Sequence, residues 1–279
     1  MMDRKIERYF EGIESTDGAG VRLIRTFGYH DVPDFDPFLL LDFFDSTNPD
    51  DYIKGFPWHP HRGIETVTYL ISGKMEHSDS IGNSGVIADG DCQWMTAGSG
   101  ILHQEMPQPS PRMLGVQIWL NLSKKDKMTK PKYRDILNDT IPVYSDDKMK
   151  VHIIAGEFNG IRGPLEVMET EPIFFDVELN PNEEFVFNLD STLKAFAFLV
   201  EGEVNFNVAK EELVSSPKGV LYENGDTIRI NTKEKSARFL FLAGKPLNEP
   251  IAWGGPIVMN TREELRIASK ELQEGTFIK

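Results

Sequence analysis

Two short segments carry the side chains in this sequence that are best suited to bind a metal ion. They are His59-Pro60-His61 and, further along the chain, His103-Gln104-Glu105. In a β-strand, residues i and i+2 point to the same face, so each segment can direct both of its possible ligands into one cavity. Three imidazoles and one carboxylate suit a divalent transition metal. We expect Fe(II), for which Mn, Ni, Cu or Zn can substitute.

The elements that must position these residues are predicted to be β-strands. Alternating or β-branched runs indicate strands at 22–25, 38–44, 66–71, 93–96 and 116–120, and Gly turns such as Ser72-Gly73 and Asp89-Gly90 separate them. Residues 123 to about 150 are polar and are predicted to connect two domains. Five lysines gather there and are expected in a solvated loop: Lys124, Lys125, Lys127, Lys130 and Lys132.

The second half of the chain repeats the plan of the first. Residues 69–75 (YLISGKM) are echoed by 198–204 (FLVEGEV), and 88–91 (ADGD) by 223–226 (ENGD). Such self-similarity is typical of duplicated domains. The second copy has His152 as its only histidine, so we expect metal binding in the first half alone.

One helix is predicted, at the C-terminal end. Thr261 and Glu264 form a capping box, and Leu265, Ala268 and Leu272 fall on one face. Gly275 is the expected stop.

Composition excludes several classes of function. The net charge of −14 argues against direct nucleic-acid binding, which needs clusters of Lys and Arg. The single cysteine, Cys92, allows no intrachain disulfide, and no apolar stretch is long enough to suggest a signal segment or a membrane helix. We therefore expect a soluble intracellular monomer, cytoplasmic or, in a eukaryotic source, nuclear.

The first histidine segment also fits a longer pattern. Gly55, His59, His61, Glu65 and Gly73 resemble the first motif of the cupin superfamily. A closer resemblance, to the pirin family, extends over most of the chain. It is carried by 36–39 (DPFL), 59–67 (HPHRGIETV), 93–98 (QWMTAG), 103–107 (HQEMP), 117–122 (QIWLNL) and 255–261 (GPIVMNT).

This resemblance implies an all-β protein with two tandem cupin barrels. Residues 1–135 would form the metal-binding domain and residues 136–279 a degenerate domain without metal. The ligands of the family fall on His59, His61, His103 and Glu105. Ser99 and Gln104 differ from the residues that pirins often carry, and we expect both at the mouth of the site, where they would affect substrate preference.

The position of the carboxylate ligand stays open on spacing alone. If the strand runs straight on from His59, Glu65 also faces the cavity and could be the ligand, as in the general cupin motif. Resemblance to pirins favours Glu105. Glu65 would then hold an imidazole or a bound water, or be a buried carboxylate without a functional role. His77 is either a proton donor or acceptor near the cavity or a satisfied strand histidine.

Three functions remain, and the plainest of them is a stress-related metal-binding protein whose chemistry is vestigial. The resemblance implies a mononuclear iron dioxygenase that acts on flavonols, as in quercetin 2,3-dioxygenase, with Glu105 or Glu65 as the base. The alternative is a regulatory protein whose metal or redox state changes its affinity for a transcription factor or a metabolic enzyme. Between them, these functions imply a small flavonol-like molecule or a protein as the binding partner, and none of them involves nucleic acid or a membrane.

Overall fold

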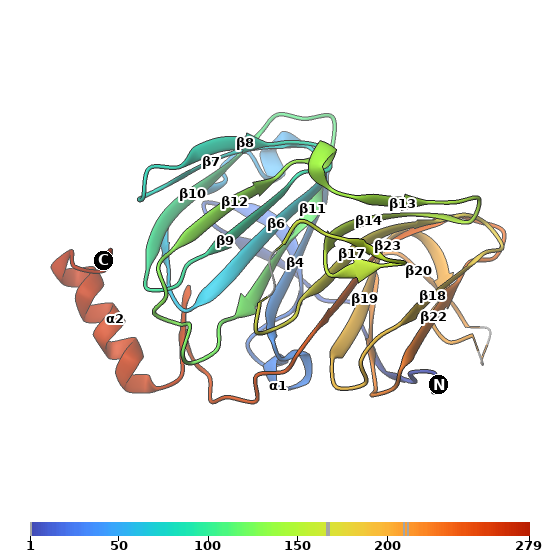
Figure 1. Cartoon of the computed structure of the whole chain (residues 1–279). Helices are drawn as coiled ribbons and strands as arrows, with labels where there is room; N and C mark the ends of the chain where they lie inside the picture. Colours follow the sequence, from blue (N-terminus) through green and yellow to red (C-terminus); the bar gives the residue numbers. More distant parts are fainter. Residues whose placement is uncertain (1, 166–167, 209, 211) are drawn as a thin grey trace. The chain divides into compact units, whose positions relative to one another are not determined.

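The computed structural model describes residues 2–165, 168–208, 210 and 212–279. Strands dominate the chain and the long helix lies at its C-terminal end, which confirms the predicted all-β class (Figure 1). Among the described residues, no helix has the length and apolar character needed to span a bilayer.

The chain divides into two compact units. The first unit comprises Gly12–Asn138 together with Leu247–Lys279, and the second comprises Met1–Glu11 together with Asp139–Pro246. These units differ from consecutive domains of residues 1–135 and 136–279, because each end of the chain belongs to the unit that contains the opposite half. The start of the chain supplies a strand that pairs in the second unit, and the end packs a hairpin and a helix in the first.

Two antiparallel sheets make up most of the first unit. The larger has the order β12-β9-β6-β11-β4-β3-β2 and the smaller the order β5-β10-β7-β8. The strands of the larger sheet are β2 (Ile13–Asp17), β3 (Val21–Phe27), β4 (Phe38–Ser46), β6 (Ile64–Ser72), β9 (Cys92–Thr96), β11 (Met113–Asn121) and β12 (Lys132–Ile136). Those of the smaller are β5 (Phe56–His61), β7 (Lys74–Asp79), β8 (Ser84–Ile87) and β10 (Ile101–Gln108). The smaller sheet lies over the larger in Figure 1.

The predicted connection at 123–150 contains the boundary between the two units, after Asn138, and part of it is regular structure. It contains β12, the 3₁₀ helix Asn138–Thr140, β13 (Val143–Ser145) and the start of β14 (Met149–Ala155). Lys127 is buried at 2 % exposure, whereas the other four lysines are exposed as expected. Its Nζ donates to the oxygens of Gly63 (2.9 Å), Asn121 (2.7 Å) and Val258 (2.9 Å), which compensates the buried charge.

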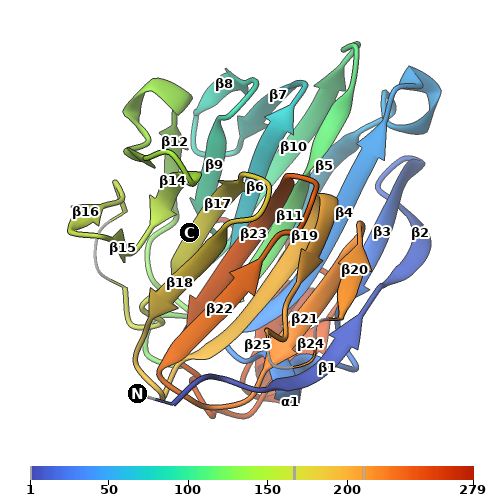
Figure 2. The same ribbon diagram turned by 90° about the vertical axis from the view of Figure 1, so that its right-hand side faces the viewer.

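Most strands of the second unit form one branched assembly. Its path is β1-β21-β19-β23-β17-β14-β13, with β20 and β22 also paired to β19 and β18 paired to β22. The bounds not yet given are β1 (Ile6–Phe10), β17 (Ile173–Leu179), β18 (Glu184–Asn188), β19 (Lys194–Asn205), β20 (Leu213–Ser215), β21 (Lys218–Tyr222), β22 (Thr227–Asn231) and β23 (Ala237–Gly244). Figure 2 shows these strands facing the viewer.

The two halves of the repeat use their glycine differently. Gly73, with φ 121°, separates β6 from β7, which belong to different sheets. Gly202, with φ 88°, lies inside the continuous strand β19, which pairs with β23 before it and with β20 after it. In both places the chain passes from one set of strand partners to another at a residue whose backbone conformation glycine adopts readily.

The remaining elements are short, apart from the C-terminal helix. They are α1 (Val32–Phe35), the 3₁₀ helix Pro49–Asp51, and the hairpins β15 (Glu157–Phe158) with β16 (Ile161–Arg162) and β24 (Ala252–Gly254) with β25 (Ile257–Met259). Helix α2 spans Arg262–Glu274. Its capping box of Thr261 and Glu264 and its end at Gly275, in the left-handed conformation, confirm the prediction.

Candidate metal centre and its pocket

Strand pairing brings the two histidine segments together. β10 runs antiparallel to β5, which places His103 opposite His59. The ring centroids of His59, His61 and His103 lie 4.3 to 5.0 Å apart. One ligand atom from each of the three lies within 4.8 Å of the others. The predicted alternation therefore does bring three imidazoles to one point.

Hydrogen bonds at the far side of two of the three rings orient their imidazole nitrogens. Nδ1 of His59 lies 2.8 Å from the carbonyl oxygen of Pro57, and Nδ1 of His61 lies 3.2 Å from that of Pro256. A carbonyl only accepts, so both Nδ1 atoms carry the proton and both Nε2 atoms present lone pairs. These two Nε2 atoms are 3.0 Å apart, and Nε2 of His103 is buried with no hydrogen-bond partner among the described residues.

These imidazole nitrogens are better placed to bind a metal ion than to take up a proton. Burial, followed by the neighbouring His59, lowers the pKa of His61 to about 3, and burial also holds the pKa of His103 well below its usual value. The rings of His61 and His103 are therefore neutral near pH 7. Two nitrogen ligands at right angles on an ion about 2.1 Å away are about 3 Å apart, which is the separation of the two Nε2 atoms. The donors that are present fit a divalent transition metal.

Glu105 lies two residues beyond His103 on β10 and is buried at 1 % exposure. Oε1 accepts a hydrogen bond from Thr68 Oγ1 at 2.7 Å, and Oε2 accepts one from Gln117 Nε2 at 2.8 Å. Each carboxylate oxygen can accept a second partner, so these bonds hold the group without using all its lone pairs. Glu105 is not part of the three-histidine group within 4.8 Å, and its role as a ligand stays a prediction.

Glu65 does not join the cluster. The chain bends at Gly63, with φ 76°, between β5 and β6, so the alternation that starts at His59 does not continue into β6. Oε1 of Glu65 accepts from Thr96 Oγ1 at 2.5 Å, and Oε2 accepts from Trp94 Nε1 at 3.1 Å. Neither of these hydrogen bonds reaches an imidazole, and the predicted catalytic role of Glu65 stays a prediction. Burial raises the pKa of Glu65.

A hydrogen-bonded group that was only partly foreseen borders the cluster. His77 on β7 pairs in register with Glu105, and its Nε2 is bonded to the hydroxyl of Tyr133. Tyr133 donates to Asp135 Oδ1 at 2.6 Å and accepts from Gln93 Nε2 at 2.7 Å. Although burial alone would raise the pKa of Asp135, the bonds from His77 and Tyr133 hold it below its usual value. Tyr133 lay in the predicted connection, so spacing gave no reason to place it here.

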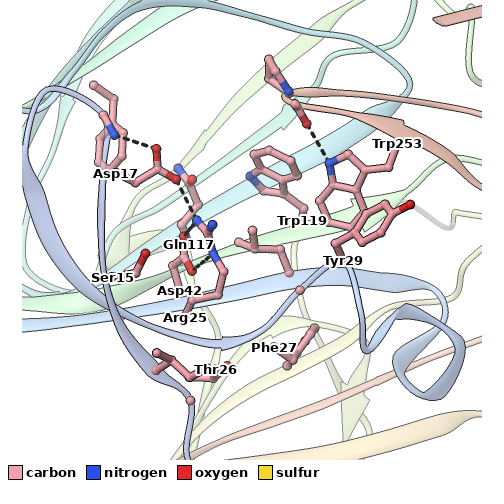
Figure 3. A pocket seen from close by; sticks show the side chains of 18 of the residues that line it. Ser15, Asp17, Arg25, Thr26, Phe27, Tyr29, Asp42, Gln117, Trp119 and Trp253 are labelled. Carbon is pink, nitrogen blue, oxygen red and sulfur yellow. Dashed lines mark hydrogen bonds and ion pairs between the residues drawn. The ribbon is translucent and has the colours of Figure 1, made fainter.

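The cluster opens into a cavity of about 1070 Å³. His59 and His61 line it, together with side chains from β2, β3, β4 and β11 and from the β24–β25 hairpin (Figure 3). Ser99 and Gln104 do not line it. The amide of Ser99 is bonded to Thr129, and Gln104 alternates with His103 and Glu105, so it points to the other face of β10. Their expected place at its mouth is therefore corrected.

The C-terminal segment completes the first unit around the cluster. Besides the Pro256 carbonyl on His61, the hairpin contributes Trp253, whose Nε1 donates to Gly255 at 2.7 Å. Arg62 is almost fully buried, donates to Phe277 O at 3.0 Å and pairs with Glu271 at 2.6 Å. The residue next to His61 therefore anchors the chain end.

Comparisons with known proteins agree with this geometry. Residues 20–120 match the family model described as Pirin, and residues 174–278 match that of the Pirin C-terminal cupin domain. The chain is 42% identical over 277 residues to a pirin-like protein of Caulobacter vibrioides, covering 98% of this chain and 99% of that one. It is 38% identical over 256 residues to the pirin of Homo sapiens, covering 90% and 86%.

A solved structure is similar over the same extent. It is titled a quercetin 2,3-dioxygenase from Acinetobacter baumannii, with a TM-score of 0.89, 31% identity and 99% of both chains covered. Family models, sequence relatives and fold agree along nearly the whole length. The chain therefore belongs to the pirin family of bicupin proteins.

Proposed function

We propose that this protein is a mononuclear Fe(II) dioxygenase that acts on flavonol-type substrates. His59, His61, His103 and Glu105 are its proposed metal ligands. The observation that carries the proposal is the convergence of unprotonated imidazole nitrogens at the wall of an open cavity. The similar structure titled a quercetin 2,3-dioxygenase supports the choice of reaction and substrate.

The residues of this chain perform three tasks in the proposed reaction. Pro57 and Pro256 fix the tautomers of two histidines, so that Nε2 faces the centre. Thr68 and Gln117 hold the carboxylate of Glu105, which accepts the proton of the flavonol 3-hydroxyl. The cavity accommodates the rest of the substrate beside the cluster. The iron, when bound, activates a chelating hydroxyl and keto pair toward O₂.

The test uses the iron-loaded full-length chain. Elemental analysis should give about one equivalent of iron, as expected for a single site. Adding quercetin without oxygen should shift the flavonol absorption band, because the deprotonated substrate coordinates the metal. Admitting O₂ should consume one equivalent of each substrate and release one equivalent of carbon monoxide. A protein fully loaded with iron that neither shifts the band nor consumes oxygen refutes the proposal and favours the regulatory alternative.

Two carboxylate variants sharpen this test. Glu105→Gln should lower kcat more than it weakens flavonol binding, since it removes a group needed in the transition state. Glu65→Gln is the matched control, because Glu65 is equally buried but bonded to Trp94 and Thr96 instead. Iron content is measured for both. Equal losses of turnover in iron-loaded Glu105→Gln and Glu65→Gln would contradict the role of Glu105.

A further inference from the structure

A row of polar side chains crosses the floor of the cavity from the cluster outward. Gln117 on β11, Asp42 on β4 and Arg25 on β3 are cross-strand partners in register. Gln117 donates to Glu105, so one end of this polar row reaches the carboxylate two residues beyond His103. At the other end, Arg25 donates from Nε and Nη2 to the two oxygens of Asp42 at 2.9 and 2.8 Å, and from Nη2 to Asp17 at 2.7 Å (Figure 3).

Aromatic side chains line the same cavity beside the polar row. Trp119 lies two residues beyond Gln117 on β11 and therefore on the same face. Its ring is 5.8 Å from that of Trp253 and 5.1 Å from that of His61, and Tyr29 lies 5.7 Å from Trp253. Nε1 of Trp119 is buried without a hydrogen-bond partner among the described residues. The wall therefore offers flat apolar surface and one unused donor.

The charged residues of the cavity are mostly acidic. Four carboxylates line it, and Arg25 is its one Lys or Arg side chain; the acids are Glu14, Asp17, Asp31 and Asp42. The side chain of Asp42 is 5 % exposed and that of Asp17 is 50 % exposed. Each of their oxygens can accept more than one hydrogen bond, so the bonds from Arg25 leave acceptor capacity for a ligand. Such a cavity attracts hydrogen-bond donors and repels anions.

We propose that this cavity selects uncharged, flat aromatic molecules that carry hydroxyl donors at the end remote from the metal cluster. Asp17 and Asp42 accept from these distal hydroxyls, Arg25 holds both carboxylates in place, and Trp119 and Trp253 contact the flat faces of the rings. The inference rests on the proposed function, since it assumes that the near end of the ligand lies at His59 and His61. It goes further by assigning specificity to Asp17, Asp42 and Arg25.

Binding is measured on the full chain loaded with Zn(II), which supports no oxygen chemistry. Three flavonols are titrated by quenching of tryptophan fluorescence: quercetin, with two distal-ring hydroxyls; galangin, with none; and 4′-carboxyflavonol, with a distal anion. We expect quercetin to bind about tenfold more tightly than galangin, the ratio that one hydrogen bond to a charged group can supply. The carboxylated compound should bind more weakly than galangin.

Asp17→Asn should bring the ratio of quercetin to galangin affinity to within about threefold, because a neutral amide accepts more weakly than a carboxylate. Asp42→Asn should do the same, and a circular dichroism spectrum checks that it folds. Asp45→Asn is the matched control. Asp45 lies on the same strand β4 and forms a two-bond ion pair with Arg112, at 2.7 Å for each bond, but it does not line the cavity. It should keep the tenfold ratio.

Equal affinities for the three flavonols in the Zn(II) protein would overturn this inference. So would a ratio that Asp17→Asn leaves unchanged. Either result leaves the proposed dioxygenase open to its own test on the iron protein. Conversely, discrimination by the Zn(II) protein together with an iron protein that consumes no oxygen would support the selective cavity while refuting the proposed reaction. If none of the three compounds bound, both the selective cavity and the proposed reaction would be overturned.

Discussion

The interiors of the two units contrast sharply. The core of the second unit is filled with buried aromatic rings: Phe158, Phe175, Phe185, Phe239 and Phe241, with Phe187 packed against them. In the first unit, the cavity-facing side of the larger sheet carries Thr68, Gln117 and Asp42 in register across its strands. One repeated strand plan thus supports two kinds of interior. Packing stabilises the second, whereas the first keeps polar groups paired around an open cavity.

The largest effect should come from a substitution in the histidine cluster. His103→Ala removes one of three converging nitrogens, so iron content should fall from about one equivalent to none. The fold should survive, since both units have hydrophobic cores away from the cluster. His152→Ala, in the second unit, is the control and should retain the metal. Elemental analysis measures the iron content and circular dichroism shows whether the variant is folded. An unfolded His103→Ala protein would contradict the prediction.

The opposite experiment targets the aromatic interior. Phe185 is fully buried, and its ring lies 5.4 Å from that of Phe239 and 5.7 Å from that of Phe158. Phe185→Ala should lower the free energy of unfolding of the second unit by about 3–5 kcal/mol without loss of metal. Val186→Ala, at an exposed neighbour on the same strand, should cost far less. Urea unfolding would refute this if both variants unfolded at the same concentration.

A substitution at Gly63 tests the importance of the bend between β5 and β6. A Cβ there would lie 2.0 Å from the carbonyl oxygen of Val258, at a φ of 76°. Gly63→Ala should therefore cost about 2–4 kcal/mol, from backbone strain and displacement of the β24–β25 hairpin. Gly160 has a similar φ of 80° but nothing within 4 Å, so Gly160→Ala isolates the strain alone. Equal losses of unfolding free energy would show that the contact with Val258 does not matter.

The smallest effect concerns the pH dependence of stability. Burial raises the pKa of Glu65 above its ordinary value of 4.5, so the folded protein holds this proton more tightly than the unfolded chain. That contribution is complete below the unfolded pKa and is lost as pH rises through the folded pKa. Wild-type stability should thus decline relative to Glu65→Gln as pH increases from 4.5. If the urea midpoints of the two proteins changed with pH in the same way, this prediction would be contradicted.

Local pattern and resemblance together anticipated much of the site and the fold. Alternation within each histidine segment correctly predicted that His59, His61 and His103 converge. Strand signals and the capping box likewise gave the all-β class and helix α2. These features depend on residues close in sequence, where the period of a strand or helix decides which side chains share a face.

Features that depend on distant pairing were beyond sequence reasoning. The bend at Gly63 decides which face Glu65 occupies, and no local pattern reports its direction. The register that aligns Arg25, Asp42 and Gln117 requires β11 to pair with β4, and these two strands are far apart in the chain. Tyr133 was missed because its strand β12 is short and polar, so that no local pattern indicated a strand there. Only the pairing of β12 with β9 places Tyr133 in the sheet.

Each end of the chain belongs to the unit that contains the opposite half, and this limits when the first unit can be completed during synthesis. Leu247–Lys279 belongs to the first unit, and Pro256 within it orients His61. The ribosome must translate all of Asp139–Pro246 before this segment emerges, which takes roughly 5–20 s at about 5–20 residues per second. A nascent chain that already displays all three histidines therefore still lacks the carbonyl that fixes one of them. The hydrogen bond from His61 to Pro256 can therefore form only once translation of the chain is nearly complete.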